Sequence, residues 1–172
     1  MAAFAEEYIA RAGTTALDLD IGVTTKAYFH DKATAIAQNG FYADGLEQIY
    51  LAGFDTLIRI FNEKYYPTGI TTSLDPFFST ARLRITARPD DKWGTLEEQE
   101  DYFVKLPREL EEKHGRGWWV DRVEMVKGGE EGDGVSSSRV RDAVRRGDRE
   151  ELEKLVGKGV SEWIEGEGLY KD

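Results

Sequence analysis

The stretch EQIYLAGFDTLIRIFNEKYY, residues 47–66, contains the two repeat periods from which the fold class can be predicted. Its first seven residues, EQIYLAG, have the composition of a short buried strand. The residues that follow repeat apolar side chains with the period of a helix, which places Leu57, Ile58 and Phe61 on one face. A strand that turns directly into a helix is the repeating element of α/β proteins.

Gly53 and Asp55 stand in the turn between this strand and this helix. In open parallel sheets, ligands bind at the carboxyl ends of the strands. A glycine at such a turn lets a ligand approach the backbone closely, and a carboxylate accepts hydrogen bonds from ribose hydroxyls. A second interpretation stays open, in which the glycine makes a tight turn and Asp55 is an ordinary helix N-cap.

Outward from this stretch, strands and helices alternate in regular order along the chain. Such an order predicts an α/β domain with a parallel sheet. We expect one domain over residues 1–172, without an internal repeat. The predicted strands are 16–23, 47–53, 82–90 and 121–129, and the predicted helices are 1–12, 31–40, 55–66 and 95–115, the last broken near Pro107, with two or three short helices from residue 136 to the end.

Composition and charge exclude several classes of protein. The 172 residues carry a formal net charge of −10, whereas nucleic-acid and membrane-surface binding need a basic face. There is no cysteine, hence no disulfide and no thiolate chemistry, and with only two histidines we predict no metal site made of protein side chains. No apolar run approaches the roughly 18 residues of a membrane span, so we expect an intracellular protein of the cytoplasm or nucleus.

A run of serines precedes an arginine-rich helix in GVSSSRVRDAVRRGD, residues 134–148. Serine is a good helix N-cap because its oxygen accepts a hydrogen bond from a free amide of the first turn. Arg139 and Arg141 lie in that turn, where the helix dipole disfavours cations. A bound polyphosphate would resolve the conflict, since hydroxyls, amides and guanidinium groups all hold phosphate oxygens. The alternative is a serine-capped surface helix whose arginines pair with neighbouring acidic residues.

Together, two segments resemble the nucleotidylyltransferase superfamily, in particular the fungal branch of its nicotinamide mononucleotide adenylyltransferase group. They are LAGFDTLIRIFNEKYY (51–66) and VSSSRVRDAVRRGD (135–148), in which VSSSRVR matches the superfamily motif I-S-S-T-x-x-R, while the ending from 155 to 170 matches its terminal helix. The resemblance covers nearly the whole chain from about Leu17. It implies a Rossmann-like α/β sheet and a reaction that joins ATP to a mononucleotide and releases pyrophosphate with the help of Mg²⁺.

The resemblance also implies roles for the residues at matching positions of the serine–arginine motif. Ser136, Ser137 and Ser138 would contact the phosphates of ATP, with Ser138 standing where the family usually has threonine. Arg141 falls on the arginine of the motif and would clamp the β- and γ-phosphates, which makes it the implied catalytic residue. Arg139 occupies a variable position of the motif and is a further candidate for phosphate contact.

By the same resemblance, Gly53 and Asp55 would meet the ribose of ATP. These roles agree with the chemistry, because nucleotidyl transfer consists mostly of positioning and charge neutralisation. The reaction has little need for a covalent nucleophile from the protein.

The segment GVTTKAYF follows the first predicted strand and is a candidate for the mononucleotide site. Thr24, Thr25 and Lys26 are suited to holding a phosphate, and Tyr28 or Phe29 to stacking on a pyridine ring. In the alternative interpretation, the two aromatic residues belong to the core beneath a loop.

The chain departs from the family pattern at its N-terminal side. The family's first strand carries an H-x-G-H motif, whereas the histidines of this sequence, His30 and His114, stand outside any such motif. The opening MAAFAEEY resembles the helix that follows the family's second strand, which predicts an N-terminally incomplete domain that lacks its first strands. An unpaired sheet edge would favour association into a homo-oligomer.

Three functions therefore stay open. The first is an enzyme that forms NAD from ATP and nicotinamide mononucleotide. The second is a noncatalytic nucleotide-binding module, degenerate or truncated, and the third is a cytidylyltransferase of the same superfamily. In each case the partners are nucleotides, without nucleic acid or membrane.

Four large aromatic residues outside these motifs have structural explanations. Trp118 and Trp119 precede a predicted strand, so we expect them to cover the sheet. Trp163 and Tyr170 have helical spacing with apolar neighbours, so we expect both to pack in the core.

Overall fold

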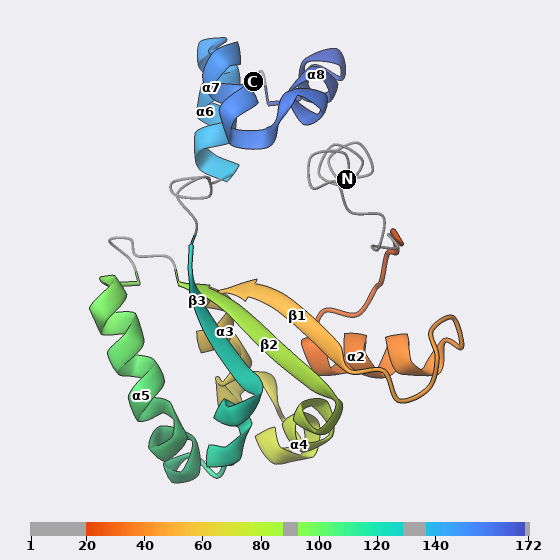
Figure 1. Ribbon diagram of the computed structural model, residues 1–172, viewed down its shortest axis with the longest axis vertical. Helices are drawn as coiled ribbons and strands as arrows, with labels where there is room; N and C mark the ends of the chain where they lie inside the picture. The colour runs from red at the N-terminus through yellow and green to blue at the C-terminus, as the bar shows by residue number, and fades with distance from the viewer. Residues whose placement is uncertain (1–19, 88–92, 129–136, 171–172) are drawn as a thin grey trace. The chain divides into compact units, whose positions relative to one another are not determined.

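A computed structural model of the chain describes residues 20–87, 93–128 and 137–170 (Figure 1). The chain forms two compact units: one consists of residues 24–131, and the other of residues 1–23 together with 132–172. The single domain expected over residues 1–172 stays a prediction.

A parallel sheet forms the centre of the unit 24–131 (Figure 1). Its strands are β1 (Gln48–Gly53), β2 (Ala81–Ala87) and β3 (Val123–Lys127), in the order β1-β2-β3. On β2, Leu83 and Ile85 are buried while the residues between them are exposed, so one face of the sheet packs on the core. The Rossmann-like α/β class with a parallel sheet is confirmed, and these strands lie close to their predicted bounds.

The predicted strand 16–23 does not form over the part that the structure describes. Residues 20–27 have no regular secondary structure, and Ile21 is 54% exposed. Alternation of apolar residues stabilises a strand only where a neighbouring strand pairs with it, and none of the described strands does so here. Residues 16–19 and the predicted helix 1–12 lie outside the described residues.

Several helices connect the strands. None of the helices in the described ranges is long and apolar enough to cross a membrane. The helices of this unit are α2 (Phe29–Gln38), α3 (Phe54–Ile60), α4 (Ile70–Thr80) and α5 (Leu96–Glu112), with short 3₁₀ helices at Glu63–Tyr65 and Gly117–Arg122.

Two helices differ from the sequence prediction. α4 was not predicted, although its buried residues Ile70, Leu74 and Phe77 have helical spacing. α5 runs unbroken through Pro107, so the predicted break is wrong. Proline removes one backbone donor, but burial of Leu106 and of Leu110 on the same helix face keeps both halves of α5 against the core.

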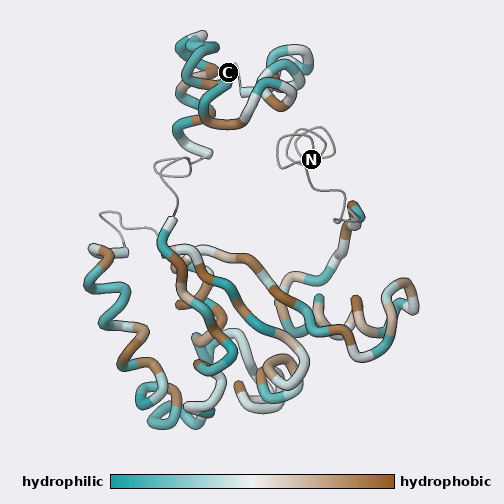
Figure 2. The backbone as a smooth tube through the Cα atoms, viewed as in Figure 1, coloured by the Kyte–Doolittle hydropathy of each residue, from teal (hydrophilic) through white to brown (hydrophobic). Residues whose placement is uncertain are grey.

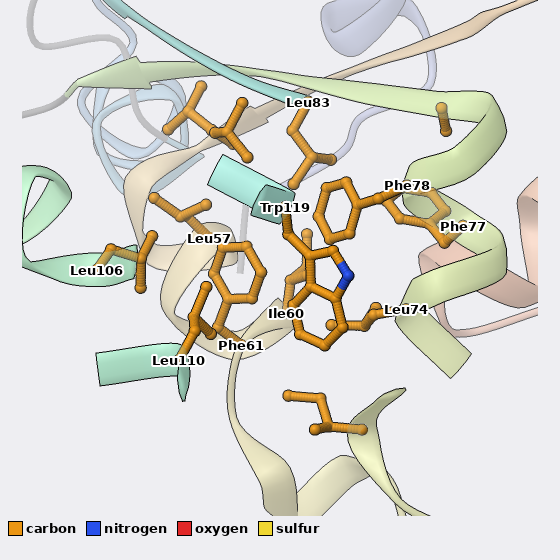
Figure 3. Packing of buried hydrophobic residues seen from close by; sticks show 14 of the residues in the cluster. Leu57, Ile60, Phe61, Leu74, Phe77, Phe78, Leu83, Leu106, Leu110 and Trp119 are labelled. Atoms are coloured by element: carbon orange, nitrogen blue, oxygen red, sulfur yellow. The ribbon is translucent and has the colours of Figure 1, made fainter. Parts of the chain in front are cut away.

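The core of the unit is built around Trp119 (Figure 3). Its side chain is completely buried and stacks on Phe61 and Phe78, with ring centroids 6.3 Å and 5.8 Å away. The indole Nε1 donates a hydrogen bond of 2.9 Å to Oδ1 of Asp75. The predicted structural role of Trp119 is confirmed, whereas Trp118 is 43% exposed.

The strand β1 is apolar along most of its length (Figure 2). Tyr50 and Ala52 pack against the core, whereas Ile49 and Leu51 point to the other face and are exposed. Among the described strands, β1 pairs only with β2.

The second unit is helical over its described part after residue 136. Its helices are α6 (Ser137–Arg146), α7 (Arg149–Val156) and α8 (Lys158–Gly166), and they share a small core of Val140, Ala143, Leu152 and Ile164.

The prediction that Trp163 and Tyr170 pack in the core is wrong. Trp163 is 59% exposed and Tyr170 is 48% exposed. On α8, the buried face is formed by Ser161 and Ile164, three positions apart. Trp163 stands one position before Ile164, so a 3.6-residue period turns it away from that face.

Candidate functional site

Gly53 and Asp55 lie where β1 passes into α3 (Figure 1). Gly53 is the last residue of β1 and the N-cap of α3, so the alternative in which Asp55 is the N-cap is wrong. A Cβ on residue 53 would lie 3.0 Å from Oδ1 of Asp55, which is tighter than nine in ten contacts of a real Cβ atom. The glycine therefore leaves room for the carboxylate. Oδ2 of Asp55 lies 3.4 Å from Nη2 of Arg59, one helical turn further along α3.

A pocket of about 340 Å³ lies beside α3, and we call it the aromatic pocket. α3 and the segment before α2 both contribute to its lining, and Arg59 is its only charged lining residue among those that the structure describes. The lining residues are Ala27, Tyr28, Phe29, Thr56, Arg59, Ile60, Tyr65 and Tyr66.

Ring contacts hold the walls of the aromatic pocket. The ring of His30 stacks on Tyr28, with centroids 5.6 Å apart, and lies 5.5 Å from the ring of Tyr66. The Tyr66 hydroxyl donates a hydrogen bond of 2.6 Å to the carbonyl of Ile60. Burial raises the pKa of Tyr66 well above its usual range, so this wall stays neutral.

The two candidate stacking residues have different surroundings. Phe29 packs against the core and makes an edge contact of 5.4 Å with Tyr50. Tyr28 is 44% exposed and lies 6.2 Å from Tyr65. Phe29 therefore belongs in part to the core, as the alternative interpretation expects. Tyr28 is the ring of the two that a ligand can reach more easily.

Thr24, Thr25 and Lys26 are exposed and come just before Ala27 of the aromatic pocket. The backbone N–H of Lys26 donates a hydrogen bond of 3.1 Å to Oγ1 of Thr24. Chain continuity thus keeps these three residues close to one end of the pocket lining.

A larger cavity, of about 400 Å³, lies at the opposite end of β1. Its lining includes Tyr42, Leu46 and Gln48, the first residue of the strand. Ligands of parallel sheets bind at the carboxyl ends of the strands. We therefore assign the candidate site to the aromatic pocket, which is lined in part by α3, the helix that begins at the carboxyl end of β1.

The serine–arginine motif forms the start of α6. Ser137 and Ser138 are the first residues of the helix and are exposed, while Ser136 lies outside the described residues. This motif belongs to the second unit, whereas Gly53, Asp55 and the aromatic pocket belong to the unit 24–131.

The arginines of α6 differ in their partners. Nη2 of Arg139 lies 3.1 Å from Oε1 of Glu151, and Arg146 binds the other oxygen of the same carboxylate. Arg145 lies 3.5 Å from Oδ1 of Asp142. Arg141 is exposed and makes no ion pair with any described residue. The surface-helix interpretation therefore holds for these paired arginines and leaves Arg141 unexplained.

Four residues of these arrangements were not predicted from the sequence: Arg59, Tyr65, Tyr66 and Glu151. Arg59 had a local signal, because a position four residues after Asp55 lies on the same helix face. The tyrosines and Glu151 come from neighbouring elements, and only the tertiary structure shows that they contribute. Among the described residues, no group of three or more histidine, aspartate or glutamate side chains could hold a metal ion.

Comparison with known proteins identifies a relative in Schizosaccharomyces pombe, which bears the name "Putative nicotinamide mononucleotide adenylyltransferase". The two proteins are 34% identical over 140 residues, which cover 80% of this chain and 54% of the relative. The chain thus spans about half the length of the curated relative that it matches. No family model and no solved structure matches the chain. In sequence the chain is thus similar to this relative, and its parallel α/β sheet is consistent with a Rossmann-like nucleotidylyltransferase fold.

Proposed function

We propose that the chain is part of an enzyme that transfers AMP from ATP to nicotinamide mononucleotide, forming NAD and pyrophosphate. A phosphate oxygen of the mononucleotide would attack the α-phosphorus of ATP. The bond from that phosphorus to the bridging oxygen would break, and pyrophosphate would leave with the electron pair. The observation that carries the proposal is Arg141 of the VSSSRVR motif, which makes no ion pair with any described residue, together with the relative in S. pombe.

The triphosphate of ATP would be held at the start of α6. The hydroxyls of Ser136, Ser137 and Ser138 would bind phosphate oxygens, and Arg141 would clamp the β- and γ-phosphates with two N–H donors. Arg141 has no acidic partner among the described residues, so it need not leave any of them to bind an anion. Arg139 would first have to leave Glu151, so we assign it a weaker contribution.

The turn between β1 and α3, in the unit 24–131, would bind a ribose. Gly53 leaves the turn open, and Oδ1 of Asp55 is the oxygen on the side of the glycine. A carboxylate there accepts hydrogen bonds from the ribose hydroxyls. Oδ2 keeps its contact with Arg59 in this arrangement.

The mononucleotide would occupy the aromatic pocket. Its pyridine ring would contact the tyrosine walls, with Tyr28 as the most accessible stacking partner. Its phosphate would lie at Thr24, Thr25 and Lys26, which precede the pocket lining in the chain.

Mg²⁺ would enter together with ATP. The exposed groups at the start of α6 are hydroxyls and guanidinium groups, which suit phosphate oxygens rather than a metal ion. The ion would therefore be held mainly by phosphate oxygens and water, as is usual for Mg²⁺, and would neutralise part of the phosphate charge.

A thermal melt with and without Mg²⁺–ATP tests the phosphate site. A ligand that binds the folded state at about a hundredfold excess over its Kd adds about 2.7 kcal/mol to the unfolding free energy. Arg141→Ala should weaken ATP binding roughly 10- to 100-fold, because hydrogen bonds to charged groups contribute about 1.5–3 kcal/mol. Arg145→Ala is the matched control, since it removes an arginine of the same helix that already pairs with Asp142.

Equal effects of the two variants on ATP binding would contradict the proposed phosphate site.

A melt with CTP in place of ATP distinguishes the cytidylyltransferase from the adenylyltransferase, because the cytidylyltransferase should be stabilised by CTP and not by ATP. The noncatalytic alternative is favoured by the separate positions of His30 and His114 outside any H-x-G-H motif. An NAD-formation assay separates it from the enzyme: ATP binding that depends on Arg141, without any product, would support the binding module.

A further inference from the structure

The strand β1 is an outer strand of the sheet in the unit 24–131 (Figure 1). It pairs with β2 on one side and with no described strand on the other. The free side of such a strand presents a row of N–H and C=O groups to which another strand can pair. Edge strands are commonly protected from this pairing by charged residues, proline or a bulge. The sequence of β1, QIYLAG, contains no charged residue and no proline.

The face of β1 that points away from the core is apolar and uncovered within the unit. Ile49 is 60% exposed and Leu51 is 75% exposed. The register with β2 places an arginine beside each of them, and both arginines already form ion pairs. Parallel sheets are normally covered on both faces. The edge therefore offers apolar contacts and backbone groups to a partner.

The cavity of about 400 Å³ at the start of β1 adjoins this edge, and we call it the edge cavity. Gln48 ties its two sides together, because Nε2 of Gln48 donates a hydrogen bond of 3.0 Å to the carbonyl of Ala33 in α2. Oε1 of the same side chain accepts a hydrogen bond from the Tyr50 hydroxyl. The cavity is thus held open between α2 and β1 by contacts within the unit. Its apolar lining residues include Ile36, Ala37, Leu46 and Ile49.

Both charged residues that line the edge cavity, among those that the structure describes, are acidic. Glu47 is neutralised within the unit, because its Oε1 lies 2.7 Å from Nε of Arg82 and 2.9 Å from Nη2 of Arg122. Asp44 is exposed and makes no ion pair with any described residue. An apolar cavity with one available carboxylate suits a long apolar stem that ends in a cation, which is the form of a lysine or arginine side chain.

The charges disfavour a second copy of the chain as the occupant of this edge. Two β1 strands in an antiparallel pair would place residue 48 of one copy opposite residue 53 of the other. The acidic residues that precede one strand would then approach Asp55, which follows the other. The formal net charge of −10 adds a general repulsion between copies. A basic partner, in contrast, is attracted to the same edge.

We propose that the free edge of β1 binds an extended basic peptide segment of a partner protein. The peptide would add a strand to the sheet through main-chain hydrogen bonds. Because side chains of a strand alternate between the two faces, every second residue of the peptide would cover the apolar face at Ile49 and Leu51. A lysine or arginine beside the start of β1 would extend over the edge cavity to Asp44.

This inference goes beyond the proposed transferase function and does not rest on it. The edge cavity lies at the start of β1, whereas Gly53 and Asp55 lie at its carboxyl end. Peptide binding should therefore occur without ATP.

The test is isothermal titration of the full chain with capped synthetic peptides. The probe alternates threonine and valine, carries a lysine at each end and is long enough to pair with all of β1, so either strand direction places one lysine near Asp44. It should bind at least about tenfold more tightly than the same peptide with glutamate at both ends, since two charges are reversed. A lysine peptide with proline at its centre should also bind at least about tenfold more weakly, because proline lacks the N–H that strand pairing needs.

A variant of the chain tests the contact at the edge cavity. Asp44→Asn should weaken binding of the lysine peptide roughly three- to fivefold, the effect of an exposed ion pair. Asp101→Asn is the matched control, because it removes the same charge from α5, where Asp101 pairs with Lys105 and does not line the cavity. Amide hydrogen exchange of residues 48–53 should slow when the lysine peptide is bound, as expected for backbone groups that enter a sheet.

Three results would overturn the inference. The first is no binding of the lysine peptide, or equal binding of the lysine and proline peptides, which excludes strand addition. The second is an equal loss in Asp44→Asn and Asp101→Asn, which would reduce the attraction to the overall charge of the chain. The third is a chain that sediments as a dimer with residues 48–53 already protected from exchange, which would assign the edge to a second copy.

Discussion

A Cβ atom on Gly53 would lie 3.0 Å from Oδ1 of Asp55, so the absence of a side chain at one position allows the carboxylate at the other. The backbone of Gly53 is extended, with φ −88° and ψ 166°, which any residue can adopt. The glycine is therefore needed for space beside Asp55 and not for an unusual backbone conformation.

Gly53→Ala should impair nucleotide binding more than stability. The new methyl group must displace the Asp55 carboxylate by a few tenths of an ångström or more, and we expect ATP affinity to fall about tenfold, the loss of one hydrogen bond to a charged group. Thermal melts and ATP titration measure both effects. Gly166→Ala is the control, because a Cβ there meets nothing within 4 Å. If Gly53→Ala binds ATP normally, the ribose contact of Asp55 is wrong.

Asp55→Asn should weaken ATP binding more than it lowers stability. The neutral amide weakens the acceptor for the ribose hydroxyls, so ATP affinity should fall by about three- to tenfold. The same change removes the ion pair with Arg59, which is exposed, so the unfolding free energy should fall by no more than about 1 kcal/mol. ATP titration and urea unfolding measure the two effects. A large loss of stability would show that Asp55 acts on the fold of the turn rather than on the ligand.

Arg139→Ala and Arg141→Ala should differ in their effects. Arg139 shares Glu151 with Arg146, so its removal should lower the unfolding free energy by about 0.2–1 kcal/mol and change ATP affinity little. Arg141 has no ion pair among the described residues, so its removal should spare stability and weaken ATP binding. Denaturant unfolding and ATP titration of both variants separate the roles. Equal losses of ATP affinity would make both arginines phosphate ligands.

Ser161→Ala should leave stability unchanged or raise it by up to about 1 kcal/mol. Oγ of Ser161 is buried in α8 without a hydrogen-bond partner among the described residues, and an unsatisfied hydroxyl opposes folding. Ser79→Ala is the contrast, since that hydroxyl donates to the Pro76 carbonyl at 2.7 Å and its loss should be slightly destabilising. Urea unfolding measures both. A marked destabilisation by Ser161→Ala would mean that the hydroxyl has a partner in solution.

Glu47 should contribute stability that depends on pH. Its hydrogen bond with Arg82, together with the charges of Arg82 and Arg122, lowers the pKa of Glu47 below its usual value. A lowered pKa in the folded state gives stability that is present above the unfolded pKa and is lost as pH falls through the folded pKa. Glu47→Gln should therefore melt below the wild type at pH 7, and the difference should vanish toward pH 3. A difference independent of pH would exclude this charge effect.

The sequence by itself determined the α/β class, three strands and the position of the β1–α3 turn, because these follow from local periods of apolar residues and from the glycine at the turn. It also predicted that α2 ends at Asn39 and Gly40, where the structure has φ +69° at the glycine. These features depend on neighbours in sequence. The helix start at the serine–arginine motif could be predicted for the same reason, because it depends on residues of a single helix.

Only the tertiary structure decided which side chains meet. Arg59, Tyr65 and Tyr66 line one pocket together with Tyr28, which precedes them by some thirty residues in the sequence. Because α7 packs on α6, Glu151 forms an ion pair with Arg139 and not with Arg141. Trp163 and Tyr170 have the apolar character of core residues, yet the packing of α8 turns Ile164 inward and leaves both exposed. Each outcome depends on contacts between separate elements, and local periodicity carries no information about such contacts.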